Sequence, residues 1–308
     1  MNPFRWLNSP TYSRFMKYRF FIPFAALLFS VLFNTGCEEE PPGVVFTEVQ
    51  KPLLDTTYVS ATPSAQLKNV LLIDITGVGC KNCPAAAVDA KNILKAHPGR
   101  VNLMAMYPYI IKPNSLTSPY AGYDTVTTDE ADNYLAGLGS IGGIPTGIVD
   151  QVKQNNSYFI PVASWFGLVD SRLLETTPVN IELAGKWIAS ENKSRLEVKL
   201  TYNQNLDTSK KHRIHIAILE DGIIGKQANS DTAGSYQYFY RFDHVMRRLI
   251  TPSTGELLKE KLTAGRVFEK HYFIAPRYNW KSDKLSALVW VTDDSDKQVL
   301  HSQEVALK

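Results

Sequence analysis

The chain has 308 residues, 44% of them hydrophobic and 20% charged, and this profile excludes an intrinsically disordered protein. Its 33 Lys and Arg residues stand against 30 Asp and Glu residues, so the formal net charge is only +3. Four of the basic residues and none of the acidic ones lie within the first 36 residues, so the rest of the chain has no basic excess and no nucleic-acid partner is expected.

Residues 1–36 are predicted to be a lipoprotein signal peptide. The apolar run from Phe20 to Phe33 is uncharged and follows Lys17 and Arg19, as in a secretory signal. The run is shorter than the roughly 20 apolar residues that a membrane span needs. The leader has an ordinary length if translation starts at Met16 instead of Met1.

The leader ends in a sequence that resembles the bacterial lipobox. In Thr35-Gly36-Cys37 the cysteine would receive the lipid and become the new N-terminus, although Asn34 stands where an aliphatic residue is usual. Cys37 has no evident partner, because the other two cysteines of the chain form a close pair. We therefore predict lipidation of Cys37, which makes the membrane a partner through buried acyl chains. The alternative is an ordinary signal peptide followed by an incidental cysteine.

Residues 37–60 are predicted to be a tether between the lipid and a folded body. The acidic triplet Glu38–Glu40 repels itself, and Pro41 and Pro42 stiffen the backbone, so this segment has no means of packing. An acidic triplet directly after the lipid cysteine also resembles the surface-export signal of Bacteroidetes-type lipoproteins. A plain solvated linker explains the composition equally well.

A βαβ unit is predicted next, with two cysteines at the start of its helix. The branched apolar run 70–75 indicates a buried strand, the Ala-rich segment 85–96 a helix, and the run 101–106 a second strand. Cys80 and Cys83 lie where the first strand gives way to the helix, in a Cys-x-x-Cys arrangement.

This position predicts redox chemistry. The N–H groups and the positive end of a helix dipole stabilise a thiolate, as does the neighbouring Lys81. We expect Cys80 to be the exposed nucleophile and Cys83 to resolve the mixed disulfide. A zinc site needs two more ligands that the sequence does not offer, so no metal or other cofactor is predicted. A purely structural disulfide is the remaining alternative.

Two further elements resemble thioredoxin-like folds. Ile144-Pro145-Thr146, after a candidate helix at 129–138, resembles the element in which a cis-proline begins a strand opposite the cysteine pair. We expect Pro145 to be cis and, with Thr146, to position substrate; an ordinary Gly-Pro turn is the alternative. Asp74, six residues before Cys80, matches a buried acid that serves as a base, unless it faces solvent at a strand end.

The sequence departs from thioredoxins in ways that leave the substrate open. Gly79 stands where thioredoxins have Trp, and Lys81-Asn82 replaces their Gly-Pro pair. The segment 107–128 is longer than a minimal thioredoxin needs and is predicted to be an inserted loop. It either shapes a substrate groove or is a surface excursion.

After a last amphipathic helix at 165–174, the helical period disappears. Short strands are predicted at 179–187, 196–202, 214–219, 236–245, 271–274, 287–292 and 299–306. The predicted fold is thus an α/β thioredoxin-like domain at 61–176 followed by an all-β antiparallel, immunoglobulin-like sandwich domain at 177–308. The aromatic residues in 236–242 are either a binding face or ring pairs that stabilise a strand.

The exported chain, from about residue 60 to 308, resembles the outer membrane protein twenty-eight family of Bacteroidetes lipoproteins. The resemblance rests on the segments 72–77 and 80–84, on His244-Val245-Met246-Arg247, and on the closing segments 288–293 and 299–303. It implies a thioredoxin-like domain joined to a β-sandwich and anchored at the outer membrane, on its periplasmic face or at the cell surface.

Two functions follow from these features. The first is a lipid-anchored thiol–disulfide oxidoreductase that acts on a protein disulfide or dithiol through Cys80 and Cys83. The second is a cell-surface adhesin or binding lipoprotein in which the Cys80–Cys83 bond is only structural and a surface ligand is the partner.

Overall fold

The computed structural model describes residues 54–109 and 116–308. Pro52–Lys308 forms one compact unit. The predicted leader, Cys37 and the predicted tether up to residue 53 lie outside the described residues. The end of that tether was expected to have no means of packing, but Thr56–Val59 forms a strand that pairs with the strand Arg266–Ile274. None of the helices in the described residues is long and apolar enough to cross a membrane.

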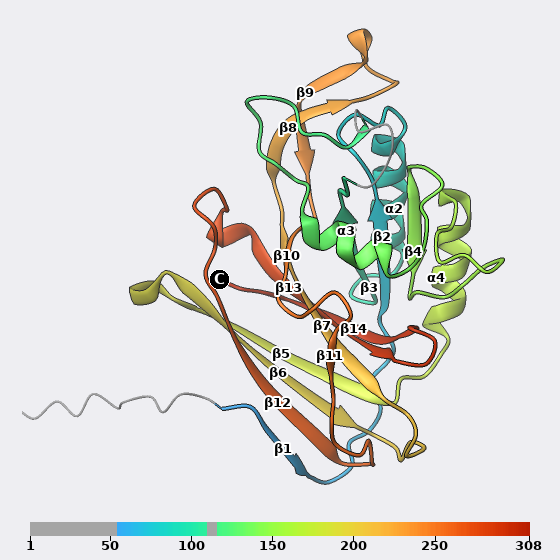
Figure 1. The fold of residues 1–308 in the computed structure, drawn as a ribbon, viewed down its shortest axis with the longest axis vertical. Coiled ribbons are helices and arrows are strands. Elements are labelled where there is room, and N and C mark those ends of the chain that lie inside the picture. Colours follow the sequence, from blue (N-terminus) through green and yellow to red (C-terminus); the bar gives the residue numbers. More distant parts are fainter. Residues whose placement is uncertain (1–53, 110–115) are drawn as a thin grey trace, which may run out of the picture. The chain divides into compact units, whose positions relative to one another are not determined.

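The helices and strands follow one another in a pattern that changes from mixed to all-β along the chain (Figure 1). They are β1 (Thr56–Val59), β2 (Val70–Ile75), α2 (Cys83–Ala96), β3 (Val101–Met106), α3 (Asp129–Ala136), β4 (Thr146–Val149), α4 (Trp165–Leu173), β5 (Val179–Ile188), β6 (Lys193–Tyr202), β7 (His212–Glu220), β8 (Ile223–Ala228), β9 (Tyr236–Phe242), β10 (Val245–Leu249), β11 (Glu256–Leu257), β12 (Arg266–Ile274), β13 (Leu285–Asp293) and β14 (Val299–Ala306).

The predicted βαβ unit is present. Strands β2 and β3 are parallel and α2 connects them, while β4 pairs with β2 in the antiparallel direction. Every residue of β2 is buried, because helices cover both faces of this part of the sheet. On one face α2 and α4 pack through residues such as Ala90 and Trp165, and on the other face α3 packs through Tyr134 and Leu135.

The same sheet continues into the all-β part of the chain. Its strand order is β14-β13-β7-β10-β3-β2-β4, with β11 added beside β7. The junction is a parallel pairing of β10 with β3 at Val245 and Ala105. The predicted domain boundary at residue 177 falls between α4 and β5, and the chain on its two sides shares this sheet.

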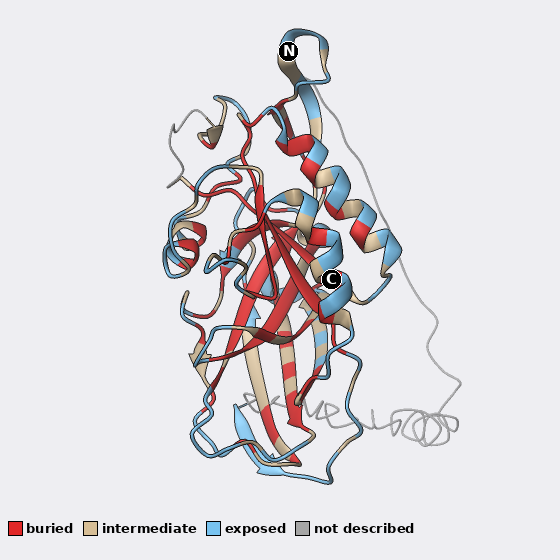
Figure 2. Cartoon of the chain, turned by 90° about the vertical axis from the view of Figure 1, so that its right-hand side faces the viewer, coloured by how far each residue is buried: buried red, intermediate tan, exposed pale blue. Residues whose placement is uncertain are grey.

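A second sheet, β1-β12-β6-β5, packs against the all-β half of the first one. Along β7 the side chains alternate: Ile214, Ile216 and Ile218 face the four-stranded sheet, whereas Ala217 and Leu219 belong to the core on the other face. Figure 2 shows the buried residues concentrated in the strands at the centre of the molecule. The molecule is thus mostly β-sheet with few helices, as expected for the second half of the sequence.

The segment 236–245, predicted as one strand, is interrupted. Strand β9 ends at Phe242, and His244 adopts a left-handed φ of 57° before β10 begins at Val245. Strand β8, which was not predicted, pairs with β9 to form a separate two-stranded sheet. This β8–β9 hairpin extends from one end of the molecule (Figure 1).

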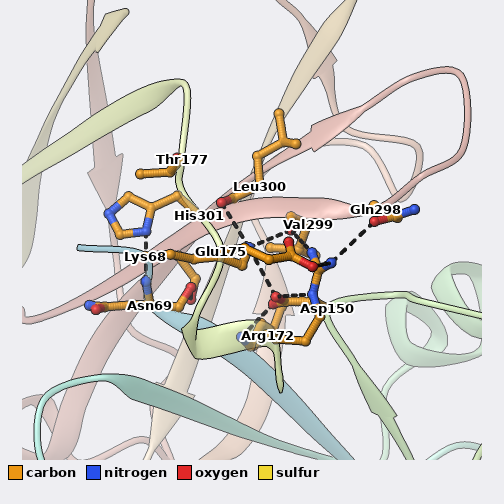
Figure 3. Close-up of polar contacts among 12 residues, drawn as sticks. Lys68, Asn69, Asp150, Arg172, Glu175, Thr177, Gln298, Val299, Leu300 and His301 are labelled. Carbon is orange, nitrogen blue, oxygen red and sulfur yellow. Dashed lines mark hydrogen bonds and ion pairs between the residues drawn. The ribbon is translucent and has the colours of Figure 1, made fainter. Parts of the chain in front are cut away.

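A buried ion cluster joins the beginning of β2 to β14 (Figure 3). Asp150, fully buried after β4, accepts charged hydrogen bonds from Lys68 and Arg172, each at 3.0 Å to Oδ2. Its other oxygen accepts from the backbone N–H of Leu71 at 2.8 Å. Lys68 and Arg172 also donate to the carbonyl oxygen of Val299 on β14. One carboxylate therefore ties residues from three separate parts of the chain.

Candidate redox site

Cys80 and Cys83 form a disulfide where β2 leads into α2. Helix α2 begins at Cys83, and Pro84 occupies its first turn, where the missing N–H leaves no hydrogen bond unmade. The helix has no side-chain cap at Asn82, so its first backbone N–H groups are not used by a capping side chain. The pair therefore lies at the helix end that favours negative charge.

The expectation that Cys80 is exposed was wrong. Cys80 is only 4% exposed and Cys83 only 2%, while Lys81 and Asn82 between them are exposed. The β8–β9 hairpin packs onto the loop that carries the cysteines, and the inserted loop contacts it as well. The sequence contained no local sign of this contact, because the hairpin lies well over a hundred residues further along the chain.

The hairpin meets the cysteine loop through hydrogen bonds. The side-chain amide of Gln227 donates to the carbonyl oxygens of Gly77 at 3.1 Å and Cys80 at 3.0 Å. The backbone N–H groups of Ala228 and Ser230 donate to the carbonyl oxygens of Val78 and Lys81, at 2.8 and 3.1 Å. The loop from residue 77 to residue 81 is thus paired along its length with the hairpin.

Other segments approach the same loop from different sides. The N–H of Gly79 donates to the carbonyl oxygen of Leu116, in the predicted inserted loop. A Cβ on Gly77 would lie 2.1 Å from that oxygen and 2.9 Å from the side chain of Ile144, so only glycine permits both contacts. The residue before Pro145 therefore lies beside the loop that leads to Cys80, and the inserted loop packs on it.

Thr146 begins β4 beside the end of β2, and Pro145 directly precedes the strand, as expected. The Ile144–Pro145 peptide bond is cis, as the sequence predicted. Thr146 pairs with Ile75, and its hydroxyl donates to the carbonyl oxygen of Ile160 at 3.0 Å. The hydroxyl is thus engaged within the fold, whereas Pro145 is half-buried.

Asp74 is buried and not solvent-facing. It is 3% exposed, and its Oδ1 has no hydrogen-bond partner among the described residues. Removal from water raises the pKa of this carboxyl from its ordinary value of 3.8 to about 7. Burial is the largest cause that raises the pKa values of Tyr107 and Tyr240, and the charge of Asp74 contributes to both rises. The three groups therefore lie in one buried, apolar region.

The motif residue Arg247 has a structural role that the sequence alone did not reveal. It is 3% exposed and pairs with Glu220 at 3.1 Å and with Asp124 at 3.0 Å. Burial raises the pKa of Glu220, and the Arg247 guanidinium opposes that rise. Asp124 belongs to the inserted loop, so Arg247 fastens that loop to the shared sheet. Arg247 lies two residues beyond the strand predicted at 236–245, and the family-like segment 244–247 was the only signal available.

A comparison with known protein families shows to which family the chain belongs. The model of the outer membrane protein Omp28 family matches residues 133–308, which is more than half of the chain. The chain belongs to the Omp28 family. It is accordingly an outer membrane protein, as the sequence motifs implied. No curated protein matches the chain.

Solved structures give a comparison at the level of the fold. HBP35 of Porphyromonas gingivalis is similar over 81% of this chain and 77% of its own, with a TM-score of 0.59 and 16% identity. A domain of the outer membrane lipoprotein Omp28 from the same organism matches 43% of this chain and 89% of its own, with a TM-score of 0.28 and 14% identity. At 16% identity, and with a TM-score of 0.59, the likeness to HBP35 concerns the fold alone.

Proposed function

We propose that this Omp28-family protein is a lipid-anchored thiol–disulfide exchange protein that acts through Cys80 and Cys83. Residues 61–176 form its thioredoxin-like domain and residues 177–308 its immunoglobulin-like sandwich. The observation that carries the proposal is the disulfide at the N-terminus of α2. There the helix end and Lys81 favour a thiolate, and a bond that closes so short a loop restricts the unfolded chain little.

The exchange would proceed in two displacements. The Cys80 thiolate attacks a substrate disulfide, forms a mixed disulfide and releases one substrate thiolate. The thiol of Cys83 then loses its proton and attacks the sulfur of Cys80, which restores the Cys80–Cys83 bond and releases the second substrate thiol. Two electrons pass to the substrate, and the reverse sequence oxidises a substrate dithiol. The buried carboxyl of Asp74 is the proposed proton acceptor for Cys83.

Cysteine variants test this proposal. Cys80→Ser should abolish exchange with a model protein disulfide, because the proposed attacking thiolate is gone and Cys83, at 2% exposure, does not replace it. Cys83→Ser should accumulate a mixed disulfide at Cys80, because nothing resolves it. The measurement is gel or mass detection of the adduct after alkylation of free thiols.

The control variant is Cys37→Ser, made in cells. It should lose incorporation of a labelled fatty acid and release the protein from the membrane, while its exchange activity stays at the wild-type rate. Protease treatment of intact cells then reports whether the anchored protein faces the cell exterior or the periplasm.

Exchange that persists in Cys80→Ser would contradict the redox proposal.

A second candidate function is a surface-binding or adhesion protein in which the disulfide is structural. It is favoured by the burial of both cysteines and by the exposed rings of the hairpin, Tyr238 at 54% and Phe239 at 83% exposure. A Cys80→Ala/Cys83→Ala double variant that binds host material at full strength would support it. Loss of that binding in Tyr238→Ser/Phe239→Ser, with the disulfide intact, would locate the binding face.

A further inference from the structure

A single side chain, that of Gln227, makes two of the hydrogen bonds between the hairpin and the cysteine loop. Gln227 is 2% exposed, and its amide nitrogen lies within 3.1 Å of three backbone carbonyl oxygens, those of Gly77, Cys80 and Ala228. An amide nitrogen has two hydrogens, so these carbonyls share them. A buried amide that lost these acceptors would be left unsatisfied, which makes the contact specific to this residue.

The local geometry of β8 aims Gln227 at the loop. The register between β8 and β9 shifts between Gly225 and Gln227, so the strand is irregular at Lys226. Irregularities of this kind redirect side chains and are frequent beside functional sites. Here the side chain of Lys226 points among three tyrosine rings, with its ammonium 4.1 Å from the centre of Tyr236 and 4.6 Å from that of Tyr120.

The two ends of the hairpin differ in how firmly they are held. At its base, Ile223 and Phe242 are buried in one cluster with Val78 and Tyr107. Further out, the side chains of β9 are mostly exposed, Phe239 most of all. The outer part is therefore held mainly by hydrogen bonds and by the Lys226 contacts. Segments with few buried apolar contacts open at low free energy while the rest of the protein stays folded.

We propose that the β8–β9 hairpin is a gate over the Cys80–Cys83 pair and that Gln227 is the positioning residue that holds the gate closed. Cys80 is only 4% exposed, and the outer hairpin is hydrogen-bonded to the backbone of residues 77–81 around it, so we expect an attacking thiolate to reach the disulfide only when the outer hairpin moves. The gate makes the site selective, because only a partner that displaces Gln227, Ala228 and Ser230 from the loop gains access. This role in selectivity rests on the proposed exchange function, whereas the gating itself does not.

The test uses dithiothreitol as a small reductant and the intact folded protein. Its first thiolate attacks a sulfur of the pair and frees one cysteine, and its second thiol then displaces the other cysteine. Two electrons and two protons pass to the pair, and the reagent becomes its cyclic disulfide. The rate is followed by trapping free thiols with an alkylating agent and measuring the mass. Since reduction by dithiothreitol needs only access, it reports on the gate even if exchange with proteins fails.

Gln227→Met removes the amide and keeps the length of the side chain. We expect its disulfide to be reduced at least about tenfold faster than that of the wild type, because the hydrogen bonds that hold the gate are gone. The matched control is Gln237→Met, since Gln237 faces Gln227 across the hairpin and its side chain is exposed. The control should be reduced within about twofold of the wild-type rate. Equal rates for Gln227→Met and the wild type, with both folded, would overturn the proposal.

Hydrogen exchange of the wild-type protein keeps the test decisive if Gln227→Met fails to fold. The amides of Ala228 and Ser230, which donate to the cysteine loop, should exchange through a local opening that is insensitive to low denaturant concentrations. The buried amides of β2 should exchange only through global unfolding. If Ala228 and Ser230 also exchange only through global unfolding, the hairpin is a fixed part of the fold and no gate exists.

Discussion

At the scale of single residues, Asp74 is the most unusual group in the site. On this fully buried strand, Oδ1 of its carboxyl has no hydrogen-bond partner among the described residues, which is a poor arrangement for stability because ionisation there is unfavourable. Its pKa of about 7 means that it exchanges a proton in the neutral range, where a proton acceptor for a thiol is useful. The residue thus fits a chemical role better than a packing role.

Asp74→Asn tests this burial through the pH dependence of stability. Below the ordinary pKa of 3.8 the carboxyl is protonated in both the folded and the unfolded chain and contributes no difference. As the pH rises from about 4 through 7, only the unfolded chain ionises freely, so the wild type loses stability that the Asn variant keeps. We expect the variant to gain about 4 kcal/mol on the wild type between pH 4 and pH 8, measured by urea unfolding. A gain that is the same at both pH values would contradict the assignment.

The residues of the site differ in how far the sequence could predict them. The cis bond at Pro145 was predicted, because the residue sits between recognisable turn residues at a suitable spacing after the cysteines. The burial of Asp74 was one of two alternatives that the sequence left open, and the structure selects it. The contact that the hairpin makes at Cys80 was not predictable, because Gln227, which makes it, lies 147 residues away in the sequence. A glutamine in an unremarkable segment gives no sign that its amide will meet the carbonyl oxygens of a distant loop.

At the scale of elements, β8 shows why short strands escape prediction. Asp221-Gly222 is the kind of pair that joins two hydrogen-bonded strands in a hairpin. Here it links β7 to β8, yet β8 pairs with β9 in a separate sheet. The strand also lacks a clean alternation, since Gly225 and Lys226 interrupt it. The longer strands β5, β6 and β14 were predicted within a few residues of their observed bounds, because their apolar period is regular.

The buried ion cluster around Asp150 is the clearest interaction that stabilises the packing of several elements against one another. It fastens the residues before β2 and the helix α4 to the backbone of β14, all through groups that are nearly inaccessible to solvent. Burial is the largest influence on Lys68 and lowers the pKa of its ammonium, and the Asp150 carboxylate opposes this. The charged lysine is thus kept in place by its partner.

Removing that partner should be costly. Asp150→Asn leaves Lys68 and Arg172 buried without their shared counter-charge, and we expect it to lower the free energy of unfolding by about 3–5 kcal/mol. The control is Glu182→Gln, which breaks an exposed pair with Lys199 and should change stability by less than about 1 kcal/mol. Urea unfolding at neutral pH measures both variants. Similar effects for the two would show that the cluster contributes no more than a surface pair.

At the scale of the whole molecule, the continuous sheet is the feature that local patterns could not predict. Composition and periodicity separated a mixed part from an all-β part correctly, because helical and strand periods differ. The join depends on β10 lying parallel to β3 and on α3 packing against strands from both parts, such as β2 and β13. These pairings are set by distant residues, so a single sequence indicates two parts without showing their common sheet.

Both parts of the chain contribute to the candidate redox site, because they share one sheet. Strands β2 and β4 and helix α2 supply the cysteine loop and its neighbours, whereas the later part of the chain supplies the hairpin that covers it. The cysteines alone would be compatible with either a structural or a working disulfide. The distinction depends on how readily the pair accepts and donates electrons once it is reached.

The reduction potential of the Cys80–Cys83 pair is the most direct test of the exchange function. The protein is equilibrated with defined ratios of reduced and oxidised dithiothreitol, long enough for the gate to open, and the free thiols are then trapped and counted by mass. We predict a potential above about −300 mV, in the range of disulfides that work in exchange. A potential below about −300 mV would mean a structural bond and would contradict the account.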